Sequence, residues 1–382
     1  MVKQAQLEKS PMIRLADRYS VVFIGITFSI AFLTYMLTRD MQKVLAVLVI
    51  ATPCPLILAP PIALMGGVSA ASRRKIMVKN LASLEALSRV QALIFDKTGT
   101  LTLGRPTVKR VSTYTTLYDE DYLIGLSASI EKNSLHPLAK AVVQYAKDKQ
   151  ITDVLIEKIE ETVGHGIEGS VNGQHYRLSK IPQSRGMTIG LFSSENELLL
   201  QFDFEDQLKP NSSHILKNLI KKGLTLFLFT GDKKERTAEL VAPLQLDISI
   251  EADCSPEQKK EKIMALKKKG LITAMIGDGI NDAPALSAAD VGLVFSHQEQ
   301  TASTDAADII FLDGDLSLVL EAIQLASHTI SIATRCIIWG IAASSLGMLA
   351  ASTGFLPPIY GAFLQEGIDI AVILYALQVR KF

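Results

Sequence analysis

The sequence has little cysteine and no excess of either charge. Its three cysteines, Cys54, Cys254 and Cys336, are far apart, which excludes a disulfide framework or a zinc ribbon and suits a reducing compartment. The 39 basic and 39 acidic residues cancel, so we expect no nucleic-acid partner. The first residues carry mixed charge and no apolar core beside a cleavage site, so we expect no signal peptide.

What the sequence does have is apolar residues gathered in blocks, with 48% hydrophobic residues and a mean hydropathy of +0.26. Four blocks are about long enough to cross a bilayer, and we predict transmembrane helices at about 19–37, 44–68, 336–352 and 359–377. Basic residues gather on one side of these spans, at Arg14, Arg18, Arg73 to Lys75 and Arg380-Lys381, while the turns on the other side hold little beyond Arg39. The positive-inside rule then predicts that both termini and the segment between spans two and three lie in the cytoplasm. We expect an integral protein of the plasma (inner) membrane.

The second span is interrupted by prolines around Thr52 and Cys54. Proline unwinds a helix, and unwound backbone at membrane depth is tolerated where it faces protein or a polar cavity. The sequence therefore predicts a cation site containing Thr52 and Cys54, with a soft sulfur ligand that favours transition metals. A proline kink with a packing cysteine is the alternative.

The last span contains Gln365, Glu366 and Asp369. Acids are costly inside a membrane, so we expect all three polar residues to contribute to the cation site. The alternative places Gln365 and Glu366 at the interface and pairs Asp369 with another helix.

The segment Leu93 to Thr102 predicts a phosphoryl-transfer site. An apolar strand ends at Asp96, and the turn Lys97-Thr98-Gly99-Thr100 follows. A buried parallel strand delivers such a carboxylate to the carboxyl edge of an α/β sheet. Asp96 then serves as the nucleophile, and Lys97, the threonine hydroxyls and the amides around Gly99 surround the developing charge. A lone aspartate after a strand would otherwise be read as a turn former.

Three further motifs follow predicted strands or open helices, and their order along the chain argues against turn chemistry alone. They are Thr230-Gly231-Asp232, the Ser255-to-Lys259 helix start and Gly277 to Pro284. Thr230 is expected to bond phosphoryl oxygens, and Lys259 to neutralise the phosphate. Asp278 and Asp96, with the Thr98 carbonyl, are predicted to hold Mg²⁺. The full predicted catalytic set is Asp96, Lys97, Thr98, Thr230, Gly231, Asp232, Lys259, Asn281 and Asp282.

Between these motifs, residues from about Gly104 to Lys209 interrupt the sheet. We expect strands at 105–114, 169–179, 190–193 and 197–204, and a helix from near Leu138 through Tyr145. His136 and Pro137 precede that helix, and the glycines Gly164 and Gly166 would let backbone approach a nucleotide closely. Each signal is weak alone. Residues 73–90 are predicted to form one amphipathic helix that couples the second span to Asp96.

The order of parts resembles the metal-transporting branch of the P-type ATPases, over nearly the whole chain. The matching pieces are Thr52-Pro53-Cys54, Asp96 to Thr102, Ser134 to Pro137, Gly164 to Gly166, Thr230 to Asp232, Pro256 to Lys259 and Gly277 to Pro284. The resemblance implies ATP and Mg²⁺ as cofactors, a transition-metal ion as cargo, and nucleotide binding by Glu131, His136, Pro137, Gly164 and Gly166. Leu135 replaces the glutamate that usually precedes the histidine, which puts adenine binding in doubt.

The implied fold class is four transmembrane helices plus a cytosolic α/β part, in which a Rossmann-like haloacid dehalogenase (HAD) phosphorylation domain carries an inserted α+β nucleotide-binding domain. The predicted domains are the first helix pair (1–72), the phosphorylation domain (73–103 and 208–326), the nucleotide-binding domain (104–207) and the second helix pair (327–382).

Thr52 replaces the first thiolate of the Cys-Pro-Cys found in copper and zinc pumps, as in the Thr-Pro-Cys group. One thiolate with carboxylates and an amide suits a divalent ion such as Ni, Co, Fe or Zn better than Cu(I). The Thr-Gly-Glu triplet of the family's actuator domain does not occur, so we expect a fragment, a product of a broken gene, or a chain that works with a separate actuator-bearing chain and turns over poorly alone. The alternatives are a membrane-anchored HAD phosphatase and a regulatory subunit that binds ATP or metal without transport.

Overall fold

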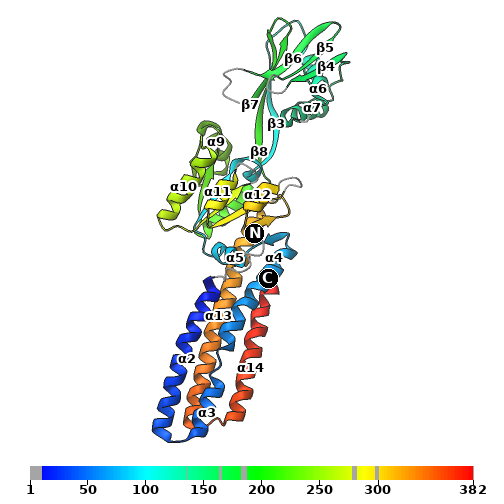
Figure 1. Ribbon diagram of the computed structural model, residues 1–382. Coiled ribbons are helices and arrows are strands. Elements are labelled where there is room, and N and C mark those ends of the chain that lie inside the picture. The colour runs from blue at the N-terminus through cyan, green and yellow to red at the C-terminus, as the bar shows by residue number, and fades with distance from the viewer. Residues whose placement is uncertain are drawn as a thin grey trace. The chain divides into compact units, whose positions relative to one another are not determined.

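The computed structural model describes residues 11–134, 136–162, 166–181, 187–277, 282–296 and 301–381. The chain divides into two compact units, residues 1–100 with 211–382, and residues 101–210. The first unit holds an apolar helix bundle and a parallel sheet, and the second holds an antiparallel sheet with two helices (Figure 1).

The helix bundle consists of α2 (Pro11–Thr38), α3 (Met41–Ile50), α4 (Cys54–Arg73), α13 (Ser317–Thr353) and α14 (Pro358–Ala376), and the short turn η4 (Leu377–Lys381) follows α14. By length and composition these helices provide four segments apolar enough to cross a membrane: Tyr19–Thr38, Met41–Arg73, Ser317–Thr353 and Pro358–Lys381. Their outward faces carry exposed large apolar side chains such as Phe28, Phe32 and Trp339. This composition confirms the predicted class of a four-span membrane protein.

The parallel sheet of the first unit has the strand order β1-β13-β12-β11-β2-β9-β10, and only the β1–β13 pair is antiparallel. Its strands are β1 (Ile76–Val78), β2 (Ala92–Asp96), β9 (Thr225–Phe229), β10 (Ile248–Glu251), β11 (Thr273–Gly277), β12 (Val291–Phe295) and β13 (Ile309–Phe311). The three central strands β12, β11 and β2 are buried along their whole length, as expected for a sheet covered on both faces.

The helices that accompany this sheet are α5 (Leu81–Leu87), α8 (Ser212–Lys221), α9 (Lys234–Val241), η2 (Ala242–Leu244), α10 (Pro256–Lys268), α11 (Ala283–Ala288) and α12 (Thr301–Ala306). Ile263 of α10 and Leu286 of α11 share one apolar core with Ile94, Met275 and Val294 of the central strands. The sheet is therefore the rigid element that positions the loops at its carboxyl edge.

The second unit is a six-stranded antiparallel sheet with the order β3-β8-β7-β6-β5-β4. Its elements are β3 (Thr102–Thr113), α6 (Glu120–Glu131), α7 (Pro137–Asp148), β4 (Lys158–Thr162), β5 (Gly166–Val171), β6 (Gln174–Lys180), β7 (Met187–Ser193) and β8 (Leu198–Leu208). Residues of α6 and α7, such as Leu126, Ile130 and Val142, pack with Leu191 and Phe202 of the sheet in a separate core.

Two sequence predictions about elements are wrong. The helix predicted over 73–90 is three elements, because α4 ends at Arg73, Lys75 takes a positive φ of 61° and β1 and α5 follow. The strand predicted over 169–179 is a hairpin of β5 and β6, because Asn172 (φ 49°) and Gly173 (φ 76°) form a tight two-residue turn. At both places left-handed backbone ends an element although the hydropathy pattern continues without a break.

Candidate functional site

Asp96 is the last residue of the central strand β2, which lies between β11 and β9 in parallel register. The position brings its carboxylate to the carboxyl edge of the sheet, where it is 7% exposed. The turn that follows wraps around this carboxylate. Gly99 takes a φ of +70°, and the Thr98 amide donates to Asp96 Oδ2 at 3.0 Å. The nucleophile predicted from the sequence is therefore a buried, oriented carboxylate at a strand end.

Lys259 reaches Asp96 from the first turn of α10. Pro256 and a capping box between Ser255 and Gln258 begin that helix, which fixes where the lysine emerges. Lys259 Nζ lies 2.5 Å from Asp96 Oδ1 and 2.8 Å from Asp282 Oδ1. Asp282 folds over the end of β11, because a Cβ on Gly277 would come within 2.7 Å of Asp282 Oδ2. Residues from three separate motifs thus converge around one ammonium group.

The charges of this cluster shift one another. Burial raises the pKa of Asp96 to about 6, and the nearby Asp282 charge adds to the increase, while Lys259 opposes it. Burial lowers the pKa of Lys259, but its two carboxylate partners outweigh that effect and hold the pKa above its usual value. One lysine therefore leaves negative charge at the sheet edge incompletely compensated.

The loop after β9 lies beside the turn after β2. Lys97 forms an ion pair with Asp232, and the Asp232 amide donates to Thr230 Oγ1 at 3.1 Å. The Thr230 amide in turn donates to the Glu251 carbonyl at 3.0 Å, which anchors the loop to β10. Thr230 is buried. The predicted Thr230-Gly231-Asp232 motif is thereby joined to the nucleophile loop through Lys97.

Two predicted residues, Asp278 and Asn281, lie outside the described residues. The described groups fit a divalent cation. Two carboxylates, Asp96 and Asp282, share the single positive charge of Lys259, and Mg²⁺ prefers carboxylate oxygen. The buried Thr100 hydroxyl finds no hydrogen-bond partner in the described part of the chain. Such an unpaired polar atom is expected where a polar ligand completes the site.

In the second unit, Glu131 is buried at the end of α6, and Ser134 Oγ donates to Glu161 Oε1 at 3.1 Å. Burial raises the pKa of Glu131 to about 7, and the charge of Glu161 adds to the shift. His136 is the N-cap of α7, where its Nδ1 accepts from the Leu138 amide at 3.2 Å. An accepting Nδ1 places the proton of a neutral imidazole on Nε2, so the exposed ring offers a donor.

The remaining predicted nucleotide residues have different outcomes. Pro137 is the first residue of α7. Gly166 begins β5 with a φ of +114°, and a Cβ there would lie 2.1 Å from the Leu178 carbonyl oxygen. Glycine at 166 is therefore required by close strand packing, whatever else it does. Gly164 lies outside the described residues, as does Leu135.

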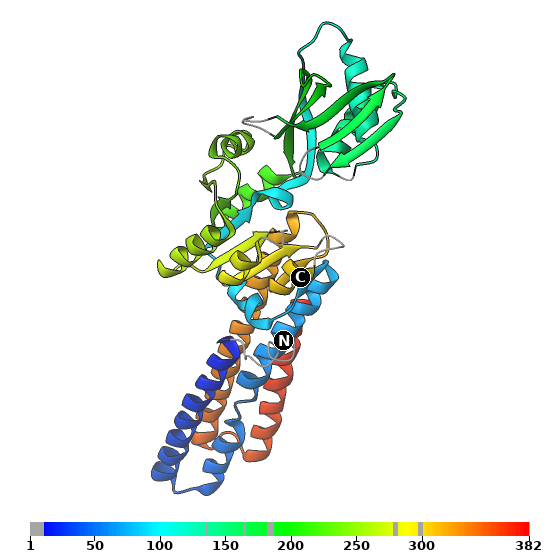
Figure 2. The same ribbon diagram turned by 45° about the horizontal axis from the view of Figure 1, so that its top comes forward.

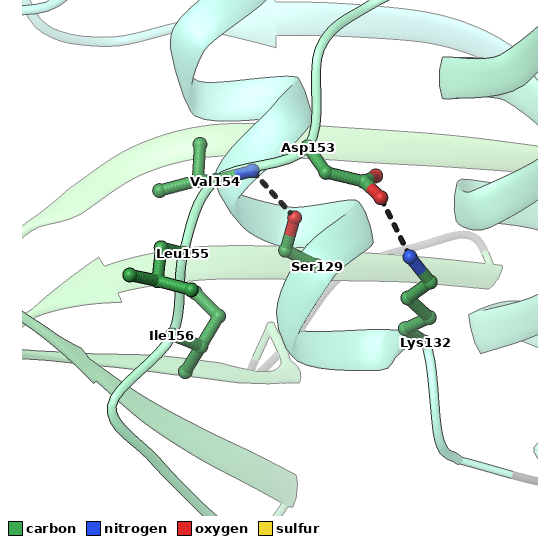
Figure 3. Close-up of a pocket in the computed structure, with 6 residues that line it drawn as sticks. All are labelled: Ser129, Lys132, Asp153, Val154, Leu155 and Ile156. Carbon is green, nitrogen blue, oxygen red and sulfur yellow. Dashed lines mark hydrogen bonds and ion pairs between the residues drawn. The ribbon is translucent and has the colours of Figure 1, made fainter.

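A cavity of about 340 Å³ lies beside α6 in the same unit, lined by Ser129, Lys132, Asp153, Val154, Leu155 and Ile156 (Figure 3). The Val154 amide donates to Ser129 Oγ at 2.9 Å, and Lys132 pairs with Asp153 at 2.6 Å. These polar groups satisfy one another across the cavity. We interpret them as attaching the segment before β4 to α6.

In the helix bundle, the second span is broken where the prolines predict, because α3 ends at Ile50 and α4 begins at Cys54. The buried Thr52 hydroxyl in this break finds no hydrogen-bond partner among the described residues. The Cys54 side chain interacts with the Asp369 carboxyl group, and Gln365 Nε2 donates to Asp369 Oδ1 at 2.9 Å. The break and α14 thus bring a thiol, a carboxylate and an amide together.

Glu366 does not join this group. It is exposed on α14, because a helix turns about 100° per residue and Gln365 already faces inward. The sequence reasoning also missed a member, since Ser344 of α13 is buried and donates to Gln365 Oε1 at 3.3 Å. A serine in an otherwise apolar span was the available signal.

Residues 90–290 match the family model of the haloacid dehalogenase-like hydrolases. The chain belongs to this hydrolase family.

Its likeness within that family is to metal-transporting P-type ATPases, as the motifs predict. It is 33% identical to the copper-exporting P-type ATPase of Bacillus subtilis (strain 168), over 100% of this chain and 51% of the relative. A zinc-transporting PIB-type ATPase in the E2.Pi state superposes with a TM-score of 0.84 at 27% identity, over 99% of this chain and 66% of that one. The catalytic domain of the CPx-ATPase CopB-B, from a structure that describes conformational changes upon nucleotide binding, matches at 30% identity. Its TM-score is 0.59, over 67% of this chain and 98% of that domain. The chain spans about half the length of the curated relative.

Proposed function

We propose that this chain is the catalytic part of an ATP-driven transition-metal pump that forms an aspartyl phosphate at Asp96. The observation that carries the proposal is the cluster of Asp96, Lys259 and Asp282 at the carboxyl edge of the sheet. An oxygen of the Asp96 carboxylate attacks the γ-phosphorus of ATP. The new O–P bond forms as the bond to the β-γ bridging oxygen breaks, and ADP leaves with that electron pair.

The surrounding side chains position the reacting groups. Lys259 neutralises charge on the phosphoryl oxygens as it approaches Asp96, and Thr230 offers its hydroxyl to the same oxygens. Lys97 is oriented by Asp232. Mg²⁺, when bound by Asp96, the Thr98 carbonyl and Asp278, supplies charge neutralisation at the transferred phosphate.

We infer that residues 101–210 bind the nucleotide. The buried carboxylate of Glu131 and the Nε2 donor of His136 lie at the two ends of one short connection, between α6 and α7. A carboxylate acceptor and an imidazole donor together complement an adenine edge, which carries both an amino group and ring nitrogens.

The cargo site is proposed to consist of Thr52, Cys54, Gln365 and Asp369. One sulfur with oxygen and amide ligands favours a divalent ion such as Ni, Co, Fe or Zn over Cu(I). The relatives' names mention copper and zinc, so the choice among metals is a question for experiment. Export is proposed from the cytoplasm across the plasma (inner) membrane, with the parallel sheet and the antiparallel sheet both on the cytoplasmic side.

Because the sequence contains no Thr-Gly-Glu triplet, we also propose that hydrolysis of the phosphoenzyme depends on an actuator-bearing segment or chain. The test uses the full chain in lipid nanodiscs with γ-labelled ATP. We expect acid-stable, hydroxylamine-sensitive label in the wild type and none in Asp96→Asn. Label that persists in Asp96→Asn would refute Asp96 as the nucleophile.

The cargo assignment has its own test. We expect the labelling of the chain to depend on one of Zn²⁺, Co²⁺, Ni²⁺, Fe²⁺ or Cu⁺, and Cys54→Ala to abolish that dependence. Cys336→Ala is the matched control, because this second membrane cysteine donates its thiol to the Val372 carbonyl. Equal loss in both variants would contradict a specific site at Cys54.

A further inference from the structure

Three exposed cations gather where α4 and η4 meet at one end of the helix bundle. Arg73 ends α4, and Arg380 and Lys381 lie at the end of η4. Arg73 Nη2 donates to the main-chain carbonyl of Arg380 at 2.8 Å, which joins the two elements. Both ribbon views place the C-terminal end of the chain beside the end of α4 (Figures 1 and 2). We call Arg73, Arg380 and Lys381 the α4–η4 cation cluster.

The two neighbouring cations on the α4 side each face a carboxylate. Arg74 lies 4.0 Å from Glu321, and Lys75 lies 2.8 Å from Asp313. No carboxylate in the described ranges comes within ion-pair distance of the α4–η4 cation cluster. Three positive charges therefore face the surroundings without an acidic partner from this part of the protein.

An apolar surface lies directly beside the cluster. Leu377 is three residues before Arg380, and Leu374 lies a further turn down the helix with 60% of its surface exposed. On α4, Met65 is 66% exposed two turns before Arg73. In a bundle that spans a bilayer, such side chains contact acyl chains, so the cations lie at the level of the headgroups.

We propose that the α4–η4 cation cluster binds the phosphate headgroup of an anionic phospholipid whose acyl chains lie along α4 and α14. Guanidinium groups form paired, charge-assisted hydrogen bonds to phosphate oxygens. Basic groups at a cytoplasmic membrane surface attract anionic lipid in the same way. A bound headgroup would bridge the C-terminal end of α4, which carries Cys54, and the turn η4 that follows α14, which carries Asp369.

The test compares lipid selectivity in two double variants of the full chain. Arg380→Gln/Lys381→Gln removes two cluster charges and keeps the Arg73 bond to the residue-380 carbonyl. Arg74→Gln/Lys75→Gln removes two charges that are already paired. Each protein is placed in nanodiscs of phosphatidylcholine with spin-labelled phosphatidylglycerol or spin-labelled phosphatidylcholine, and the motionally restricted fraction of each label is measured.

We expect the wild type to prefer phosphatidylglycerol, and Arg380→Gln/Lys381→Gln to reduce that preference by roughly fivefold or more. The control pair and the charge-conserving Arg380→Lys/Lys381→Arg variant should retain it. Unchanged selectivity in Arg380→Gln/Lys381→Gln would overturn the proposal, because it would show that the cluster does not hold the lipid. An equal decrease in the control pair would also overturn it, because it would show that total charge alone attracts the lipid.

Discussion

At the scale of single residues, the nucleophile is buried among charges that oppose its ionisation. Its pKa of about 6 is caused first by burial and then by the charge of Asp282. Because only the ionised carboxylate attacks phosphorus, we expect phosphoenzyme formation to slow as pH falls through about 6. Initial rates of labelling between acidic and neutral pH measure this midpoint.

The Asp282→Asn variant separates this effect from the titration of ATP itself. Removing the Asp282 charge takes away one cause of the raised pKa, so the midpoint of the remaining activity should move to lower pH. A midpoint that stays in place would mean that another group controls the profile.

The free energy of unfolding depends on the same carboxyl group, with the opposite sign. Its contribution is full below the unfolded pKa near 3.8 and is lost as pH rises through about 6.

The sequence predicted that Asp96 lies near Lys259 and Asp278, because motifs at the ends of parallel strands share one edge of the sheet. Asp278 lies outside the described residues, and Asp282 of the same motif is the carboxylate that meets Lys259. The sequence did not predict the bond between Ser344 and Gln365 or the proximity of Glu161 to Glu131. Those contacts depend on how two helices are rotated and how a strand lies against a helix end. Neither quantity is encoded in the local pattern of one segment.

At the scale of elements, glycine on α13 lets the broken span approach closely. A Cβ on Gly340 would lie 2.6 Å from Pro55 Cβ, and one on Gly347 would lie 2.8 Å from Ile50 Cγ2. These two positions pack against the residues on either side of the break. The small residues therefore determine where the break lies relative to Ser344.

We expect Gly340→Val to displace the break and to abolish metal-dependent labelling while leaving nucleotide binding intact. Gly367→Val on α14 is the matched control, because a Cβ there meets nothing within 4 Å. Metal titrations of the labelling reaction, with fluorescent-nucleotide binding in parallel, measure both effects. A Gly340→Val chain with an unaltered metal response would show that this close contact has no role in the cargo site.

Element prediction succeeded where one signal dominated and failed where the chain reverses within a few residues. The four spans follow from composition, because a lipid-facing surface must be apolar. The break in the second span follows from its prolines, which interrupt a helix. The predicted helix over 73–90 failed at Lys75, a left-handed residue that hydropathy does not reveal. The predicted third span, 336–352, lies within α13, which continues through polar residues well outside the apolar block.

At the scale of the whole molecule, α13 contacts elements beside the sheet and elements of the helix bundle in the first unit. The helix α13 begins shortly after β13 and continues for 37 residues, about 55 Å at the usual rise. It packs on α5 and α8 beside the sheet and on α3, α4 and α14 in the bundle. Thr329 lies at the contact with α4, because a Cβ on Gly67 would come within 2.6 Å of its hydroxyl.

Because α13 is one continuous helix, a rotation or a shift at its start should move its far end as well. One alanine inserted after Thr329 should turn the remainder by about 100°, so that Gly340 and Ser344 no longer face the break. We expect such a chain to bind nucleotide normally but to lose the metal response of its labelling, while the same insertion in the 313–315 loop leaves that response in place. If both insertions behave alike, the nucleophile cluster and the break in the helix bundle are coupled by some route other than α13.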